Sequence, residues 1–180
     1  MTFSSASATP HASQMQTIPT ESRKLQIPSN KINERNALSK DEIKDIENHL
    51  FELKDEDRKM LALMMFGGLR RGEALGVKWN DIQWEDGCIH ITRNVTFAKN
   101  QPCIGTPKIQ KGYRLIPLND TLIKYLGEKR TDDAFIIGEE QAIFHQSFKW
   151  RMKRIQNTID LHGATPHVLR HTYLTHLAAT

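Results

Sequence analysis

The sequence predicts a mainly α-helical domain with a small antiparallel β-sheet, an α+β fold. Apolar residues recur at helical spacing in the first part of the chain, alternate with polar residues in the middle, and return to helical spacing near the end. The predicted order is therefore helices, then a small sheet, then helices again. A chain of 180 residues is long enough for one such domain with a hydrophobic core.

The first 35 residues are expected to form a disordered leader or linker. The first thirty contain six Ser, four Thr and three Pro, without hydrophobic periodicity. Such a composition offers too little apolar surface to offset the entropy of ordering the chain. We therefore expect the domain to occupy residues 36–180.

Three helices are predicted at the start of the domain. Ser39 and Glu42 have the spacing of a capping box, and the apolar residues that follow share one helical face. A second helix is expected over residues 55–66, ending at the glycine pair 67–68, and a short third helix from Arg71. The apolar face of the first helix comprises Ile43, Ile46, Leu50 and Leu53.

The middle of the chain switches to the two-residue period of a β-strand. One strand is predicted over residues 89–97, because its apolar and polar side chains alternate. Two further strands, 104–109 and 113–118, are expected around a turn at 110–112. Pro117 has no amide hydrogen to donate to a neighbouring strand, so the last strand should lie at an edge or end there.

Helical patterns return after the sheet. Helices are expected over residues 119–126 and 143–155, the second with Phe144, Phe148, Met152 and Ile155 on one face. Thr165 followed by Pro166 has the form of an N-cap and first helical residue, so a last helix should begin there and run to the end of the chain.

Positive charge is concentrated in two stretches, although the net charge is only +4. Residues 97–115 contain four Lys and Arg and no acid, and residues 145–180 contain five against the single acid Asp160. This asymmetry suits a polyanionic partner, nucleic acid first, although a solvated basic surface is an equally good explanation of charge alone.

The two cysteines, Cys88 and Cys103, are too few for a disulfide framework and form no metal-binding CxxC pair. Because both fall in predicted strands, we expect small buried hydrophobic side chains in a reducing, cytoplasmic compartment. No apolar run approaches the roughly 18 residues of a membrane span. The N-terminus also lacks the charge and apolar pattern of a secretory signal.

Arg70 is the first cation placed to bind a phosphate. It follows a glycine break at a predicted helix start, where backbone geometry would hold its planar guanidinium in place. Glu73, one turn further on, is spaced to orient that guanidinium. The alternative is an ordinary solvated Arg–Glu pair on a helix surface.

The turn at residues 106–112 carries the second group of cations, Lys108 and Lys111. A lysine on a tight turn can reach into a neighbouring groove, and nearby positive charges lower its pKa toward that of a useful proton donor. Lysines in turns are more commonly just solvated.

His167 and Arg170 form the third group, three residues apart on one face of a predicted helix. A histidine and an arginine near a helix N-terminus bind anions and supply a group that titrates near neutrality. Ordinary capping and packing is one alternative. Another is a metal site built from His162, His167, His171 and His176, although no HExxH-type acid accompanies these histidines.

In this order, the three groups resemble the tyrosine recombinase, or phage integrase, family. Residues 68–82 (GLRRGEALGVKWNDI) resemble its first arginine box, residues 106–118 (TPKIQKGYRLIPL) its lysine hairpin, and residues 167–172 (HVLRHT) its His-x-x-Arg box. The resemblance covers residues 36–180 and is greatest to integrases of Gram-positive phages and conjugative transposons. It implies the catalytic-domain fold of that family, incomplete at the C-terminus.

The resemblance implies a role for each residue. Arg70 and Arg170 would clamp the non-bridging oxygens of the scissile phosphate in double-stranded DNA, where negative charge builds in the transition state. His167 would help to hold that phosphate and move protons. Lys108, or alternatively Lys111, would protonate the departing 5′-hydroxyl, and Glu73 would support the arginines. No metal and no other cofactor is implied.

The family's nucleophile is a tyrosine that forms a 3′-phosphotyrosyl link, in an enzyme that assembles with other protomers on DNA. That tyrosine is expected beyond the end of this chain, about 30 residues after the His-x-x-Arg box, so none of Tyr113, Tyr125 and Tyr173 is nominated. The expected function is site-specific recombination or integration. The alternative is a non-catalytic DNA-binding or vestigial integrase fragment.

Overall fold

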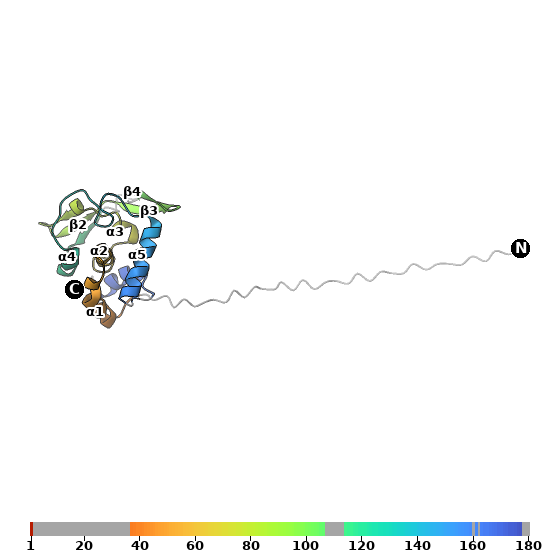
Figure 1. Cartoon of the computed structure of the whole chain (residues 1–180), viewed down its shortest axis with the longest axis horizontal. Helices are drawn as coiled ribbons and strands as arrows, with labels where there is room; N and C mark the ends of the chain where they lie inside the picture. Colours follow the sequence, from red (N-terminus) through yellow and green to blue (C-terminus); the bar gives the residue numbers. More distant parts are fainter. Residues whose placement is uncertain (2–36, 107–113, 160, 162, 178–180) are drawn as a thin grey trace. The chain divides into compact units, whose positions relative to one another are not determined.

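The computed structural model describes Met1 and residues 37–106, 114–159, 161 and 163–177. Chain contacts divide the protein into residues 1–32 and a compact unit of residues 33–180. The leader predicted for residues 1–35 lies almost entirely outside the described residues and stays a prediction. Figure 1 colours the described part of the compact unit from orange to blue.

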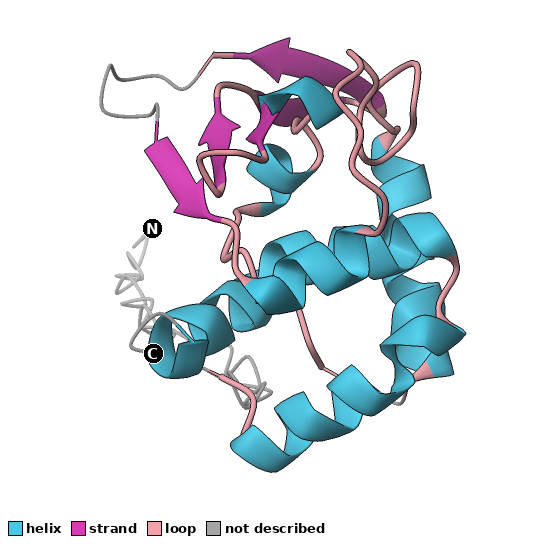
Figure 2. Cartoon of the chain, turned by 90° about the vertical axis from the view of Figure 1, so that its left-hand side faces the viewer, coloured by secondary structure: helices cyan, strands magenta, loops and turns pink. Residues whose placement is uncertain are grey.

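Strands gather on one side of the compact unit and the longer helices on the other (Figure 2). This arrangement confirms the predicted α+β class with helices before and after the strands. The described helices are α1 (Lys40–His49), η1 (Leu50–Glu52), α2 (Asp55–Met65), α3 (Arg71–Ala74), η2 (Trp79–Asp81), α4 (Asp120–Leu126), α5 (His145–Thr158), α6 (Pro166–Thr172) and the π-helical turn η4 (Tyr173–Leu177). The described strands are β1 (Ile82–Gln83), β2 (Cys88–Ile91), β3 (Asn94–Ala98), β4 (Gln101–Gly105) and β5 (Arg114–Pro117).

Local signals in the sequence place the helices correctly. The Ser39 hydroxyl accepts the Glu42 backbone amide, and the Glu42 carboxylate accepts the Ser39 backbone amide at 2.8 Å, which completes the predicted capping box. Asn119 caps α4 and Thr165 caps α6, each by accepting a backbone amide bond. All four apolar residues predicted for the first helical face are buried.

Helix α2 forms the centre of the core. Every residue from Met60 to Met65 is fully buried, so this helix is surrounded by protein along its second half. It packs against α3, α4, α5 and α6. Hydrophobic burial around α2 therefore fixes the helices that carry the predicted site residues.

The single strand predicted over residues 89–97 is wrong, because the chain breaks there into β2 and β3. These strands belong to different antiparallel sheets, one with the order β1-β2-β5 and one with the order β3-β4. The break lies at residues 92–93, where both side chains turn to Asp81. Arg93 donates to the Asp81 carboxylate at 2.6 Å and Thr92 at 3.2 Å.

The next predicted pair of strands also needs correction. The strand expected from residue 104 begins at Gln101 and ends at Gly105, and it pairs with β3. Strand β5 pairs instead with β2 and forms an edge of its sheet within the described residues, and Pro117 is its last residue, as predicted. The turn predicted at residues 110–112 lies outside the described residues.

The two cysteines lie on strands, as predicted, but they are not buried. Cys103 is exposed on β4 and Cys88 is half-buried on β2, and both are free thiols. The expectation of two small core side chains is therefore wrong. No helix among the described residues combines the length and the apolar character that a membrane span requires.

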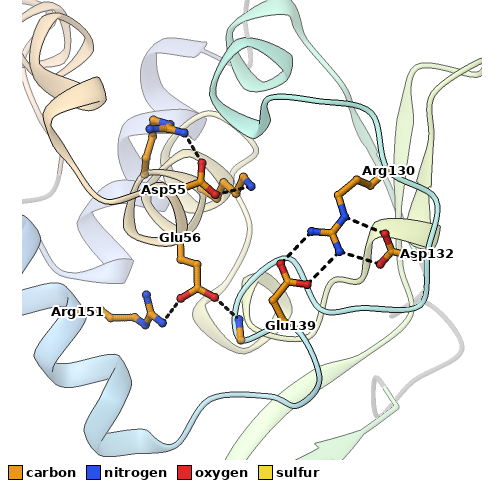
Figure 3. Close-up of polar contacts among 9 residues, drawn as sticks. Asp55, Glu56, Arg130, Asp132, Glu139 and Arg151 are labelled. Atoms are coloured by element: carbon orange, nitrogen blue, oxygen red, sulfur yellow. Dashed lines mark hydrogen bonds and ion pairs between the residues drawn. The ribbon is translucent and has the colours of Figure 1, made fainter.

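Ion pairs fasten α5 to α2 on the side shown in Figure 3. Arg151 pairs with Glu56 and with Asp57, and Arg154 donates to the Asp57 carboxylate at 2.7 Å. Glu56 also accepts the backbone amide of Gly138 at 3.1 Å. Two of the cations expected to form a basic surface are therefore neutralised within the fold.

Candidate active site

Arg70 stands at the point where the glycine turn after α2 meets α3. Gly68 has φ +60, in the left-handed region that glycine adopts without steric cost. A Cβ atom at this position would lie 2.2 Å from the ring of Tyr173, so the close packing also requires glycine. The turn ends at Arg70, which is the N-cap of α3. The side chain of Arg70 is 62% exposed.

Glu73 holds Arg70 in place, as the sequence predicted. Its carboxylate accepts the backbone amide of Arg70 at 2.8 Å and the Arg70 guanidinium at 2.9 Å. It also accepts a bond of 2.7 Å from Arg114 on β5. One buried carboxylate therefore links two cations from different elements.

Burial of Glu73 opposes its ionisation, but the Arg70 amide and guanidinium and the charge of Arg114 outweigh that effect. The pKa of Glu73 accordingly lies below its ordinary value. The carboxylate is therefore an anion near neutral pH and a permanent anchor for Arg70.

Helix α6 brings His167 and Arg170 to the same place. The Thr165 hydroxyl accepts the Val168 amide at 3.3 Å, and Pro166 is the first helical residue, so α6 begins where the sequence predicts. His167 is exposed, and Arg170 is half-buried. The Arg170 guanidinium donates a hydrogen bond to the backbone carbonyl of Gly68.

An open pocket of about 620 Å³ joins these elements. Of the predicted site residues, Arg70, His167 and Arg170 line it, while Glu73 lies behind Arg70. The predicted Lys108 and Lys111 lie outside the described residues. The lining residues are Arg70, Arg71, Gly72, Asn94, Val95, Thr96, Thr165, Pro166, His167 and Arg170.

The pocket is strongly cationic. No acidic residue is among the described residues that line it, whereas three arginines are. Burial first, and then the charges of Arg114 and Arg70, lower the pKa of Arg170. A guanidinium keeps its proton in proteins, so crowding of like charges here favours binding of an anion between them.

Sequence reasoning missed two arginines of this site. Arg114 was part of a basic stretch and of the hairpin motif, and Arg71 was the start of a helix within the arginine box, but neither was given a role in the site. The pairing of Arg114 with Glu73 joins residues 41 positions apart and has no local signal. Arg71 follows Arg70 directly, and its presence in the pocket depends on the placement of β3 and α5.

Neither described tyrosine lines the pocket. Tyr125 is buried in α4, where its hydroxyl donates to the carbonyl of Glu47 at 3.1 Å and its ring stacks on Phe66. The Tyr173 ring packs on Gly68. Tyr113 lies outside the described residues.

The histidines give no support for a metal site among the described residues. The His167 and His171 rings lie edge to face, with centroids 4.5 Å apart. Within the described part of the chain, no group of three or more His, Cys, Asp or Glu side chains could hold a metal ion. His162 lies outside that part.

We compared the sequence with models of protein families. The model of the phage integrase family matches residues 36–180. The chain belongs to the phage integrase family. The family match includes every predicted site residue, from Arg70 to Arg170.

Several characterised relatives share part of this integrase-family chain. The chain is 28% identical to the tyrosine recombinase XerD of Ralstonia nicotianae over 67% of its length, and 29% identical to a tyrosine recombinase XerC-like protein of Caldanaerobacter subterraneus over 88%. It is 32% identical to transposase A from transposon Tn554 of Staphylococcus aureus over 67%. The chain covers 39%, 48% and 36% of these relatives, respectively, so it spans less than half of each.

Solved structures show the same integrase fold. The Tn1549 transposon integrase in complex with a circular intermediate DNA matches with a TM-score of 0.60 at 18% identity, over 79% of this chain and 53% of that one. The XerA recombinase matches with a TM-score of 0.54 at 18% identity, over 76% and 48%. The expected catalytic-domain fold is confirmed over the described elements.

Proposed function

We propose that this chain contributes the phosphate-activating part of a tyrosine-type site-specific recombinase. The main support for this proposal is that Arg70, His167 and Arg170 line one pocket. No acidic residue is among the described residues that line it. A pocket of this charge suits a phosphodiester of double-stranded DNA. The relatives of this chain are named as recombinases, an integrase and transposases.

In the proposed reaction, Arg70 and Arg170 bind the two non-bridging oxygens of the scissile phosphate. Both guanidiniums are positioned before DNA arrives, Arg70 by Glu73 and Arg170 by the carbonyl of Gly68. Charge that develops on those oxygens then meets donors that need no reorganisation, which is the largest single source of catalysis in many enzymes.

Proton transfer completes the reaction. A tyrosine oxygen attacks phosphorus, the bond to the 5′-oxygen breaks, and a 3′-phosphotyrosyl link keeps the bond energy for rejoining. His167, exposed at the pocket, helps to hold the phosphate and takes up the proton that the attacking tyrosine loses. Lys108 or Lys111 donates the proton that the departing 5′-oxygen takes up.

The nucleophile is assigned to neither described tyrosine. The Tyr125 hydroxyl is bound to the Glu47 carbonyl in the core, and the Tyr173 ring packs on Gly68; neither residue lines the pocket. Since neither described tyrosine lines the pocket, the same cationic surface also suits the second candidate, DNA binding without cleavage.

The remaining parts of the proposal concern partners and location. The substrate is a pair of recombination sites in double-stranded DNA, bound by several protomers of the complete enzyme. A cytoplasmic location agrees with a DNA substrate and with two free cysteine thiols.

The test is covalent trapping of DNA by the protein made from the complete reading frame. Duplexes nicked next to each candidate cleavage position lose the departing strand, so a phosphotyrosyl adduct accumulates and migrates slowly in a denaturing gel. Arg70→Ala and Arg170→Ala should each lower adduct formation at least about 100-fold. Undiminished adduct formation by both variants would overturn the assignment.

A further inference from the structure

The pocket holds an arginine that neither the proposed reaction nor the sequence reasoning uses. Arg71 lines it beside Arg70, and its side chain is exposed. Among the described residues, no carboxylate pairs with Arg71 and no acceptor takes a hydrogen bond from it. Its five N–H donors are therefore free for a ligand.

Arg71 is nevertheless held in position. Its guanidinium carbon lies 5.6 Å from the ring centroid of Phe97 on β3 and 5.6 Å from that of Phe148 on α5. A cation–π contact of this kind needs no N–H donor of the guanidinium, so the donors stay available for a ligand. An arginine fixed in this way loses little conformational entropy when it binds.

The backbone beside Arg71 is equally constrained. A Cβ atom on Gly72 would lie 2.3 Å from the Asn94 side chain and 2.5 Å from the Val95 carbonyl, so α3 is pressed against β3. Asn100, at the turn between β3 and β4, accepts the first two amides of α5 at 3.2 and 2.9 Å. Helix α3 is thus packed on β3, and the turn after β3 is joined to the start of α5.

Lys149 adds a second positive charge close to Arg71, because both cations act on the ring of His145. The His145 ring stacks on Phe97 at a centroid distance of 4.8 Å. Desolvation first, and then the charges of Lys149 and Arg71, lower the pKa of His145, so both cations act on the same ring. The first turn of α5 contains no acid that would neutralise them.

We propose that Arg71 binds a backbone phosphate next to the scissile one and so positions the DNA strand for cleavage. This inference rests on the proposed function. Phosphates of one B-form strand follow one another at about 3.4 Å of axial rise. With the scissile phosphate between Arg70 and Arg170, a neighbouring phosphate falls at the rim of the pocket. Arg71 is a positioning residue, because it touches the strand but not the reacting atoms.

The first measurement is the salt dependence of DNA binding by the unchanged 180-residue chain and by its Arg71→Gln variant. A short fluorescein-labelled duplex of mixed sequence serves as the probe, with anisotropy read between about 50 and 200 mM salt. Loss of one phosphate contact should lower the slope of log Kd against log salt concentration by about 1. The dissociation constant should rise about tenfold at about 0.1 M salt, because a charge-assisted contact is lost.

Lys124→Gln is the matched control. Lys124 is also an exposed cation beside two aromatic rings, 5.6 Å from Phe51 and 5.1 Å from Tyr125, but it does not line the pocket. The Lys124→Gln variant loses the same net charge as Arg71→Gln. Because Lys124 does not line the pocket, the slope of log Kd against log salt concentration should equal that of the unchanged chain. Arg71→Lys separates charge from structure, because it should restore the slope while recovering only part of the affinity.

The outcomes separate the two proposals. If the dissociation constant of the unchanged chain for DNA did not depend on salt concentration, the proposed function itself would be overturned. Salt-dependent binding with equal slopes for Arg71→Gln and Lys124→Gln would overturn the role of Arg71 and leave the proposed function standing. In the complete enzyme, Arg71→Gln should raise the DNA concentration that gives half-maximal cleavage about tenfold, whereas Arg70→Gln should lower the cleavage rate at saturating DNA at least about 100-fold.

Discussion

The guanidinium of Arg170 donates a hydrogen bond to the backbone carbonyl of Gly68, 102 positions earlier in the chain. Gly68 lies two residues before Arg70, so the bond connects the two arginines of the site through a short stretch of backbone. The Tyr173 ring covers the same glycine. The relative position of the two arginines is therefore set by this contact between α6 and the turn after α2.

Gly68→Ala should destabilise the protein and disturb both arginines. The left-handed backbone costs a residue with a Cβ roughly 1–2 kcal/mol, and the clash with Tyr173 adds about 1–3 kcal/mol. Gly87→Ala is the control, because Gly87 has φ +62 and nothing lies within 4 Å of its added Cβ. Urea unfolding should show a clearly larger loss for Gly68→Ala. Equal losses would mean that Tyr173 does not restrict this position.

Glu73→Gln should weaken the anchoring of Arg70 and Arg114. Loss of hydrogen bonds between charged partners should lower the free energy of unfolding at neutral pH by about 1–3 kcal/mol. Adduct formation should fall as well, because Arg70 would no longer be held for the phosphate.

The pH dependence of stability gives a second check on Glu73. Because its pKa is lowered in the folded state, its contribution is complete above the unfolded value of about 4.3 and is lost as pH falls through the folded value. Glu73→Gln should therefore flatten the decline of unfolding free energy below about pH 4.3. Glu85→Gln, which changes an exposed carboxylate, should keep the original profile. A decline as steep in Glu73→Gln would contradict the lowered pKa.

Asp57→Asn should be among the most destabilising changes of a single charge. Asp57 is fully buried and binds both Arg151 and Arg154, so its loss leaves cations beside a neutral group at a cost of about 3–5 kcal/mol. Asp55→Asn, in the same helical turn, removes an exposed partner of Arg58 and should cost less than about 1 kcal/mol. Thermal unfolding of the two variants side by side tests the difference.

Tyr125→Phe and Tyr173→Phe should both retain covalent adduct formation with DNA. Tyr125→Phe loses its bond to the Glu47 carbonyl and should lower stability by about 1 kcal/mol. Complete loss of the adduct in a variant that remains folded would identify that tyrosine as the nucleophile and refute its assignment to the core or to the Gly68 contact.

Much of the helical part of this fold follows from short stretches of sequence. Ser39 with Glu42, Asn119, and Thr165 with Pro166 each satisfy helix-end donors within three residues, so the signal and the structure lie in the same segment. The resemblance of the three cationic groups to the motifs of the family implied that Arg70, His167 and Arg170 belong to one site, and all three line the pocket.

The sheets could not be predicted in the same way. Ile89, Ile91 and Val95 share one alternation that only Arg93 interrupts, and a single polar residue at an apolar position does not by itself predict a change of sheet. The break depends on Arg93 meeting Asp81, which lies 12 positions away. The partners of Arg71 and Arg114 are also set by packing between distant elements.

The entry of the chain into α1 is fixed by the helix that carries His167 and Arg170. The buried amide of Leu38 donates to the Thr172 hydroxyl at 2.9 Å, across 134 positions. A buried amide needs a hydrogen-bond partner. During synthesis the Leu38 amide therefore has no native partner until Thr172, one of the last residues described, has been made. Native packing around α2 is then complete only after residue 172 has left the ribosome. The two halves of the site assemble in that same late step, which keeps a partly made chain from presenting a finished phosphate pocket to DNA.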